Sequence, residues 1–278
     1  MRVVILCSSV YSETACAVAV RLAEMGHVPY GVLSLNTLNR GTVLRKLGQW
    51  GFRDAVHYAG TKLLARTQGA QQLNNPYLQH WLKPPDVIFR SIRDVAKRYG
   101  FPVSSCSNHN SPGSLARLKD WSPDMIVFAG GNILRTPLLQ IPRLGVINMH
   151  LGLLPEIRGM SSPEWSLLKG VPLGVTIHYM DTGIDTGPVL QKFEFTDLAR
   201  CTSLSDLRHR LIAFGVEKLG EVVADLDRGT IVAMPQTDLA QDHEKDNQYF
   251  VMHEWLQARA AERLGASRVP VLARATNE

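Results

Sequence analysis

The chain has 278 residues, of which 45% are hydrophobic and 20% charged, with 30 Lys and Arg against 25 Asp and Glu. These proportions are ordinary for a globular protein with a sizeable core, and they exclude a fibrous or disordered chain. No run approaches the roughly 18 consecutive apolar residues that a membrane span requires, so we expect no membrane partner.

The formal net charge of +5 permits an anionic substrate, such as a phosphorylated sugar or RNA. No block of consecutive basic residues marks a nucleic-acid footprint, so the sequence does not favour a nucleic-acid partner. The 4 cysteines show no CxxC spacing, and no secretory leader precedes them. We therefore expect a reduced, cytoplasmic protein.

The first 35 residues predict a strand, a helix and a second strand, at 3–7, 15–25 and 27–35. This is a βαβ unit, for which a right-handed crossover is the default. The turn after the first strand lacks GxGxxG, so nothing there indicates a dinucleotide. Ser8 and Ser9 lie in this turn, where they either help to bind a phosphate of the substrate or simply belong to a helix cap.

Residues 36–85 are the least readable part of the chain, and a helical insertion and an acceptor-binding segment both remain open. The α/β alternation then resumes, with helices expected at 90–99 and 111–118, a short strand beginning at Val103, and strands at 125–129 and 145–148. The fold class predicted is α/β, with an open, mostly parallel Rossmann-like sheet and helices on both faces. Ligands of such sheets bind outside the carboxyl ends of the strands.

Further along, the pattern predicts strands at 174–180 and 189–195, an amphipathic helix at 203–227 and a final strand at 229–234. We therefore expect a catalytic domain over 1–235 and a short C-terminal extension over 236–278. Residues 248–255 of this extension either cover the cleft or mediate a dimer contact, which leaves a homodimer open. The extension contains His243, Glu244 and His253 without HExxH or facial-triad spacing, so no metal is expected.

Two stretches carry the chemistry, at 147–150 and 181–188. Asn148 and His150 are two apart, so on an extended chain their side chains point to the same side. Asp185 follows a strand in a glycine-containing loop. An amide, an imidazole and a carboxylate brought together could support attack on a carbonyl. Taken singly, an Asn at a strand end is more often a cap, and a His there is more often a satisfied polar residue.

The chain resembles the formyltransferases that use 10-formyltetrahydrofolate. The resemblance is strongest over 124–190 and extends over 1–235. The motifs that carry it are Ile147-Asn148-Met149-His150, Leu153-Leu154-Pro155 with Arg158-Gly159, Gly174 to Asp181, and Gly183-Ile184-Asp185-Thr186-Gly187. Their order and spacing match the Asn, His, LLPxxRG and DxGxDxG elements of the family.

The resemblance implies a role for each matching position. Asn148, His150 and Asp185 match the catalytic trio of the family. Two segments match those that hold the pterin ring through backbone groups: Gly131, Asn132, Ile133 and Leu134, and Asp181, Thr182, Gly183 and Ile184. The acceptor is expected beside Ser8, Ser9, Arg158, Gly159 and Met160. In this interpretation Asn148 and a protonated His150 donate to the developing oxyanion, Asp185 accepts the proton of the amine, and no metal takes part.

The acceptor is expected to be a small-molecule amine, phosphorylated or linked to a nucleotide. The first turn lacks the glycine-rich phosphate loop of the glycinamide-ribonucleotide branch, and fewer than fifty residues follow Met234, whereas the methionyl-tRNA branch carries a C-terminal β-barrel. What remains resembles the enzymes that formylate amino sugars or natural-product amines. The alternatives are a formyltetrahydrofolate hydrolase, an enzyme like methionyl-tRNA formyltransferase, and a folate-binding protein without turnover.

Overall fold

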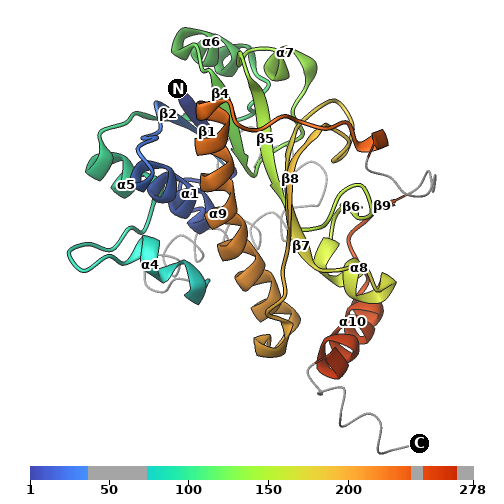
Figure 1. Cartoon of the computed structure of the whole chain (residues 1–278). Coiled ribbons are helices and arrows are strands. Elements are labelled where there is room, and N and C mark those ends of the chain that lie inside the picture. Colours follow the sequence, from blue (N-terminus) through green and yellow to red (C-terminus); the bar gives the residue numbers. More distant parts are fainter. Residues whose placement is uncertain (37–73, 239–246, 268–278) are drawn as a thin grey trace, which may run out of the picture. The chain divides into compact units, whose positions relative to one another are not determined.

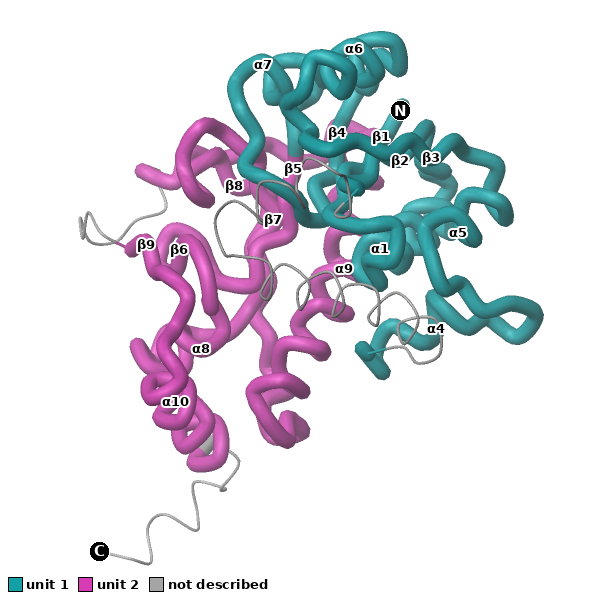
Figure 2. Tube along the Cα trace, turned by 180° about the vertical axis from the view of Figure 1, so that it is seen from behind, with its two compact units in different colours: residues 1–146 teal, residues 147–278 magenta. Residues whose placement is uncertain are grey.

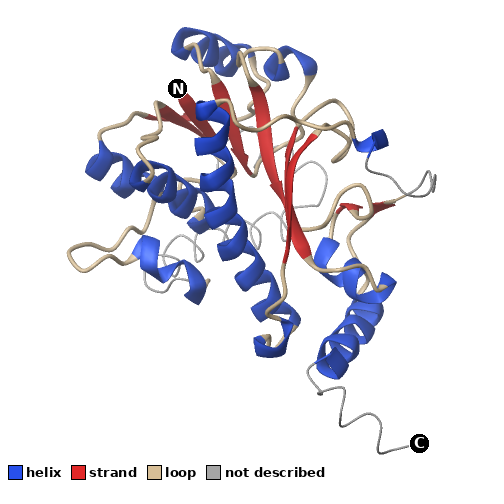
Figure 3. Cartoon of the chain, viewed as in Figure 1, coloured by secondary structure: helices blue, strands red, loops and turns tan. Residues whose placement is uncertain are grey.

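The computed structural model describes residues 1–36, 74–238 and 247–267, and the chain divides into two compact units, 1–146 and 147–278 (Figure 2). The fold is α/β, as the sequence predicts, and seven strands of the described residues form a mostly parallel sheet. Helices flank the strands (Figure 3). Much of the predicted insertion, 37–73, lies outside the described residues.

Unit 1 alternates strands and helices along the chain (Figure 1). Its elements are β1 (Val3–Cys7), α1 (Glu13–Glu24), β2 (Gly31–Leu35), η1 (Pro76–Leu78), α4 (Gln79–Leu82), α5 (Ile92–Tyr99), β3 (Val103–Cys106), α6 (Pro112–Trp121), β4 (Met125–Ala129) and α7 (Thr136–Leu139). The strands pair in parallel in the order β3-β2-β1-β4. Every residue of β1 is buried, which explains why this strand is a continuous apolar run.

The predicted elements of unit 1 are confirmed, with changes at their ends. The strand expected at 27–35 begins only at Gly31, since Pro29 has no N–H to donate and the first hydrogen bond runs from Tyr30 N to the carbonyl oxygen of Val3. The helix expected from residue 90 begins at Ile92, because Ser91 and Asp94 form a capping box in front of it.

Strand β5 (Gly145–His150) runs from the end of unit 1 into unit 2. The other elements of unit 2 are β6 (Arg158–Gly159), α8 (Ser162–Lys169), β7 (Gly174–Tyr179), β8 (Val189–Glu194), η2 (Leu198–Arg200), α9 (Leu204–Arg228), η3 (Gln236–Asp238), β9 (Gln248–Tyr249) and α10 (Glu254–Ser267). Strand β7 pairs with β5 and β8, antiparallel to both. The long helix α9 buries Leu207, Leu211, Val216, Leu219 and Val223 along one side and contacts β7.

The final strand predicted at 229–234 is wrong. Gly229 ends α9 in the left-handed conformation, with φ of 68°, and Val232 is 81% exposed, so this apolar run is not buried in a sheet. Only Met234 forms a bridge, to Val189. The expected domain boundary at residue 235 stays a prediction. Beyond it, the described residues of the extension form β9, which pairs with β6, and α10, which contacts α8.

Candidate active site

Strands β5 and β7 bring four polar side chains onto one face of an antiparallel ladder. Asn148 lies directly opposite His178, and His150 lies opposite Thr176. Because side chains alternate along a strand, residues two apart share a face with their cross-strand partners. The amide of Asn148 accordingly lies 3.1 Å from Nε2 of His178. The prediction that residues 148 and 150 face the same side is confirmed.

Asp185 is delivered to this face by the loop between β7 and β8. Asp181 shapes the loop by accepting hydrogen bonds from Gly183 N at 3.0 Å and from the Thr186 hydroxyl at 2.6 Å. Asp185 adopts the left-handed conformation, with φ of 52°, which a non-glycine residue occupies only when its surroundings hold it there. A Cβ at Gly187 would collide with the carbonyl of Tyr179, so this turn requires glycine.

A glutamine from beyond α9 holds the same loop from its backbone side. Gln236 is 5% exposed, and its amide nitrogen donates to the carbonyl oxygens of Asp185 and Gly187, each at 2.8 Å. The guanidinium of Arg158 donates to the amide oxygen of Gln236 from Nε at 3.0 Å and from Nη2 at 2.7 Å. Arg158, predicted to contact the acceptor, is thus engaged in bracing the Asp185 loop.

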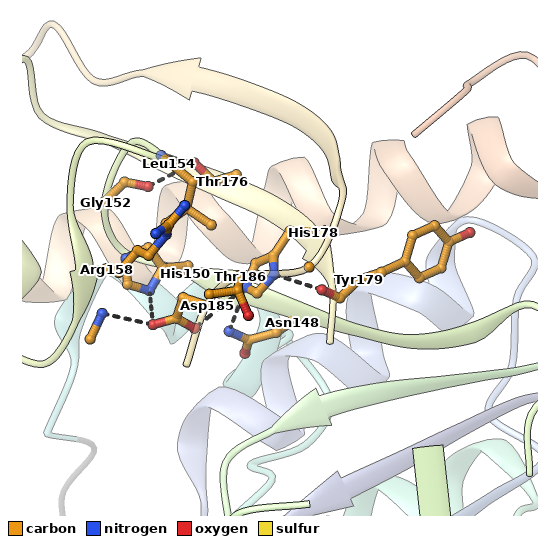
Figure 4. A network of polar contacts seen from close by, with 12 residues as sticks. Asn148, His150, Gly152, Leu154, Arg158, Thr176, His178, Tyr179, Asp185 and Thr186 are labelled. Carbon is orange, nitrogen blue, oxygen red and sulfur yellow. Dashed lines mark hydrogen bonds and ion pairs between the residues drawn. The ribbon is translucent and has the colours of Figure 1, made fainter. Parts of the chain in front are cut away.

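The carboxylate of Asp185 lies between two imidazoles (Figure 4). Its Oδ2 is 3.4 Å from Nδ1 of His150 and accepts the N–H of Gly159 at 2.9 Å. Its Oδ1 is 3.6 Å from Nε2 of His178. The structure therefore brings together the predicted trio of Asn148, His150 and Asp185, all of them within unit 2.

Carbonyl oxygens fix the tautomer of each imidazole, because a carbonyl only accepts hydrogen bonds. Nε2 of His150 lies 2.7 Å from the carbonyl oxygen of Ile157, and Nδ1 of His178 lies 2.8 Å from that of Tyr179, so both nitrogens carry hydrogen. In the neutral ring, Nδ1 of His150 then presents a lone pair toward Asp185. Both nitrogens of His150 face groups of the protein, whereas the sequence interpretation had this ring donating to the substrate.

Burial and charge have opposite effects on the pKa values of His150 and Asp185. Burial lowers the pKa of His150 most strongly; Asp185 raises it, and His178 lowers it further. Burial alone would raise the pKa of Asp185, but the two imidazoles, when they carry the additional proton, and the Gly159 N–H outweigh burial and lower it below its usual value. At neutral pH the arrangement is an ionised carboxylate facing the lone pair of a neutral imidazole, which is a place to receive a proton.

The segments expected to hold the pterin ring belong to different units. Asp181 to Ile184 form the turn before Asp185, in which the side chain of Ile184 is 38% exposed. In unit 1, Gly130 and Gly131 have positive φ, of 102° and 156°. The loop that follows is tied to residues 108–110, since Asn132 Oδ1 accepts the N–H of His109 at 3.1 Å and the carbonyl of Ile133 accepts the amide of Asn110 at 2.9 Å.

The remaining predicted contacts have local roles. Ser9 belongs to the turn before α1, where its Oγ accepts the N–H of Tyr11 at 3.2 Å, and Ser8 is exposed. Gly159 uses its N–H for Asp185, and the side chain of Met160 beside it is 58% exposed. The roles of these residues toward a substrate stay predictions.

The sequence analysis placed neither His178 nor Gln236 in the site. The signal for His178 was a histidine in an otherwise apolar strand. The strand register places it opposite Asn148, so the two side chains lie on the same face of the sheet. A lone glutamine in a loop gives no comparable signal. Among the described residues, no group of three or more His, Cys, Asp or Glu is arranged to hold a metal ion. No described helix is long and apolar enough to cross a membrane.

Comparison with known proteins gives matches to formyltransferases. Residues 94–223 match the family described as "Formyl transferase". The methionyl-tRNA formyltransferase of Trichlorobacter lovleyi is 37% identical over 159 residues, which are 56% of this chain and 48% of the relative. The chain thus spans about half the length of the curated relatives it matches.

Two solved structures share the fold. Glycinamide ribonucleotide transformylase 1 from Symbiobacterium toebii aligns with a TM-score of 0.56 at 18% identity, covering 85% of this chain and 92% of its own. A sugar N-formyltransferase from Shewanella sp FDAARGOS_354 aligns with a TM-score of 0.54 at 16% identity, covering 95% and 87%.

Proposed function

We propose that this chain, whose residues 94–223 match the formyl transferase family, transfers a formyl group from 10-formyltetrahydrofolate to an amine. The observation that carries the proposal is the position of Asp185, with one carboxylate oxygen 3.4 Å from Nδ1 of His150 and the other 3.6 Å from Nε2 of His178. An ionised carboxylate backed by a neutral imidazole suits the proton transfer that N-formylation requires.

In the proposed reaction the formyl donor supplies an activated carbonyl carbon. The acceptor nitrogen forms a bond to that carbon, and the bond from the carbon to the folate nitrogen breaks. Asn148 uses one amide N–H toward His178, which leaves a second for the oxygen on which negative charge develops. Removing a donor of this kind costs roughly 3–4 kcal/mol of transition-state stabilisation.

Asp185 accepts the proton that the amine loses, and His150 shares it. With the hydrogen on Nε2 fixed by Ile157, Nδ1 of His150 can accept a hydrogen bond from the protonated carboxyl. The proton can then pass to the departing folate nitrogen, so the carboxylate ends the cycle ionised. A positioned base of this type contributes about 10²–10⁴-fold.

Two acceptor classes follow from different observations. The curated relatives favour the amine of methionyl-tRNA, whereas the sequence interpretation favours an amino sugar or a natural-product amine. The net charge of +5 suits an anionic acceptor of either kind. The chain spans about half the length of those relatives, so their substrate cannot simply be assigned to it. Methionyl-tRNA is therefore the first acceptor to test.

The test incubates the protein with 10-formyltetrahydrofolate and, separately, methionyl-tRNA, nucleotide-linked amino sugars and hydroxylated ornithines. Formylated products are detected by mass, and formate is measured in a reaction without amine. A formylated amine supports the proposal and identifies its acceptor class. Formate released without amine supports the hydrolase, and binding of folate with neither product leaves only a folate-binding protein.

A further inference from the structure

A segment close to the C-terminus, residues 247–252, lies along β6, and we call it the strap. It contributes carbonyl oxygens to the ladder between β6 and β9. The carbonyl of Asn247 accepts the N–H of Arg158 at 2.8 Å, and that of Tyr249 accepts the N–H of Met160 at 2.9 Å. The expected C-terminal extension therefore makes direct backbone contact with the predicted acceptor loop.

The opposite edge of β6 contacts Asp185. Successive N–H groups of an extended chain point to opposite edges, so the N–H of Gly159 points away from those of Arg158 and Met160. It donates to Oδ2 of Asp185 at 2.9 Å. A Cβ at Gly159 would collide with the carbonyl of Tyr249, so only glycine lets the strap approach this closely. One short strand thus joins the strap to the carboxylate.

Side chains from α8 and the residue before it hold the strap in place. The ring of Tyr249 stacks on Trp165, with centroids 4.9 Å apart and planes 27° apart. The indole N–H of Trp165 donates to the carbonyl of Phe250 at 2.9 Å, and Ser161 Oγ accepts the N–H of Met252 at 3.1 Å. The side chain of Met252 is 2% exposed. The strap is therefore anchored at both its middle and its end.

We propose that the strap is a positioning element for Asp185, acting through the N–H of Gly159, and that it sets the basicity of the carboxylate during formyl transfer. This inference rests on the proposed function. Within the part of the chain that the structure describes, the hydrogen bonds that link the strap to Asp185 run through β6. When the strap is displaced, β6 loses two hydrogen bonds and can move away from Asp185. The carboxylate then loses the N–H of Gly159, the donor that favours its charged form.

The test compares Tyr249→Ala with Phe250→Ala, two neighbouring aromatic residues of which one stacks on Trp165 and the other has a side chain 72% exposed. We expect Tyr249→Ala to lower kcat about tenfold with little change in the KM for formyl-folate, as for loss of one hydrogen bond to a charged group. Phe250→Ala is expected to leave kcat within about twofold.

A double-mutant cycle separates positioning from a structural role. In the Asp185→Ala background, Tyr249→Ala is expected to have no further effect, because the group on which the strap acts is gone. A strap that only supports folding would lower turnover by the same factor in both backgrounds, and that result would overturn the proposal. Trp165→Phe keeps the stacked ring but removes the N–H to Phe250, and it provides a milder variant if Tyr249→Ala does not fold.

A second readout needs no catalysis. The carboxyl ¹³C resonance of Asp185, assigned by its loss in Asp185→Asn, is titrated in the wild type and in Tyr249→Ala. We expect the midpoint in the variant to move up by roughly one pH unit, since a hydrogen bond to the carboxylate is lost. An unmoved midpoint contradicts the strap proposal. Absence of formyl transfer by the wild type would contradict the proposed function alone, because the titration would still report the coupling.

Discussion

Unit 1 and unit 2 each bury a histidine beside a glycine-containing loop, but the two rings have different neighbours. His109 in unit 1 is 0% exposed, its Nε2 is 3.2 Å from the carbonyl oxygen of Leu33, and its ring lies against Gly131. His150 in unit 2 is 5% exposed, with a carbonyl at one nitrogen and Asp185 at the other. Both rings are therefore buried, and they differ in the group that faces them.

The difference teaches what makes a buried histidine chemically useful. Burial lowers the pKa of His109 to about 4, and the carbonyls of Leu33 and Cys7 offset it only weakly. At His150 the same burial is opposed by a carboxylate, so protonation of the pair becomes accessible without exposing either group to water. A buried ring alone is a neutral packing residue, whereas a buried ring facing a held carboxylate is a proton acceptor.

The largest effect is expected from removing the carboxylate that distinguishes unit 2. Asp185→Asn retains an oxygen for the N–H of Gly159 but cannot accept a proton. We expect turnover to fall at least about a hundredfold while circular dichroism is unchanged. The matched control is Asp120→Asn, an exposed carboxylate on α6. Asn148→Ala and His150→Ala should fall to a similar extent. Near-normal rates in any two of the three would end the assignment of the trio.

The buried ring of unit 1 should affect stability instead of turnover. The pKa of His109 is about 4 when folded against 6.5 when unfolded, so between these values the unfolded chain binds more protons. The stabilising contribution is complete above pH 6.5 and is lost as the pH falls to 4, by roughly 3 kcal/mol. Urea unfolding at fixed pH values measures it. In His109→Gln the decline over this window should be shallower, and an equal slope in both proteins would refute the assignment.

His178 is buried like His109 and also lies beside the carboxylate that faces His150. It is 1% exposed and contacts both Asn148 and Asp185. His178→Leu removes the partner of the Asn148 amide, and we expect kcat to fall about tenfold, as for one lost hydrogen bond. Steady-state kinetics should show the loss in kcat more than in KM. His178→Gln keeps a polar group and should recover part of the rate; equal losses in the two variants would indicate a packing role alone.

Much of the molecule could be predicted because its signals are local. The buried run Val3–Cys7 and the Ser91 cap before α5 each fix an element within a few residues. The trio was found from a strand period of two together with a family resemblance. The strand expected at 229–234 failed because its apolar residues resemble a buried strand, whereas Val232 is 81% exposed.

What could not be predicted depends on contacts distant in sequence. The bonds from Gln236 to Asp185 and Gly187 span 51 and 49 residues, and no local pattern marks a glutamine for this role. The strap contacts Arg158 and Met160 from about ninety residues away, and for this segment the sequence left open a cover for the cleft or a dimer contact. The side chains of the candidate trio could therefore be predicted from the sequence, and the groups that hold them could not.

The smallest effect is expected from variants of Arg158 and Gln236. They distinguish the predicted role of Arg158, contact with the acceptor, from the role that its contacts support, bracing the Asp185 loop. Arg158→Lys keeps the charge but not the two-nitrogen contact to Gln236, and Gln236→Ala removes the brace from the loop directly. If the arginine acts through the loop, both variants should lower kcat by about threefold or less and leave the KM for the acceptor unchanged. If it binds an anionic acceptor, Gln236→Ala should leave that KM unchanged while neutral Arg158→Met raises it well above the value for Arg158→Lys. Because Arg158 contacts Gln236, and Gln236 donates to the backbone of Asp185, the first pattern would extend the contrast between the units from the carboxylate itself to the groups that hold its loop.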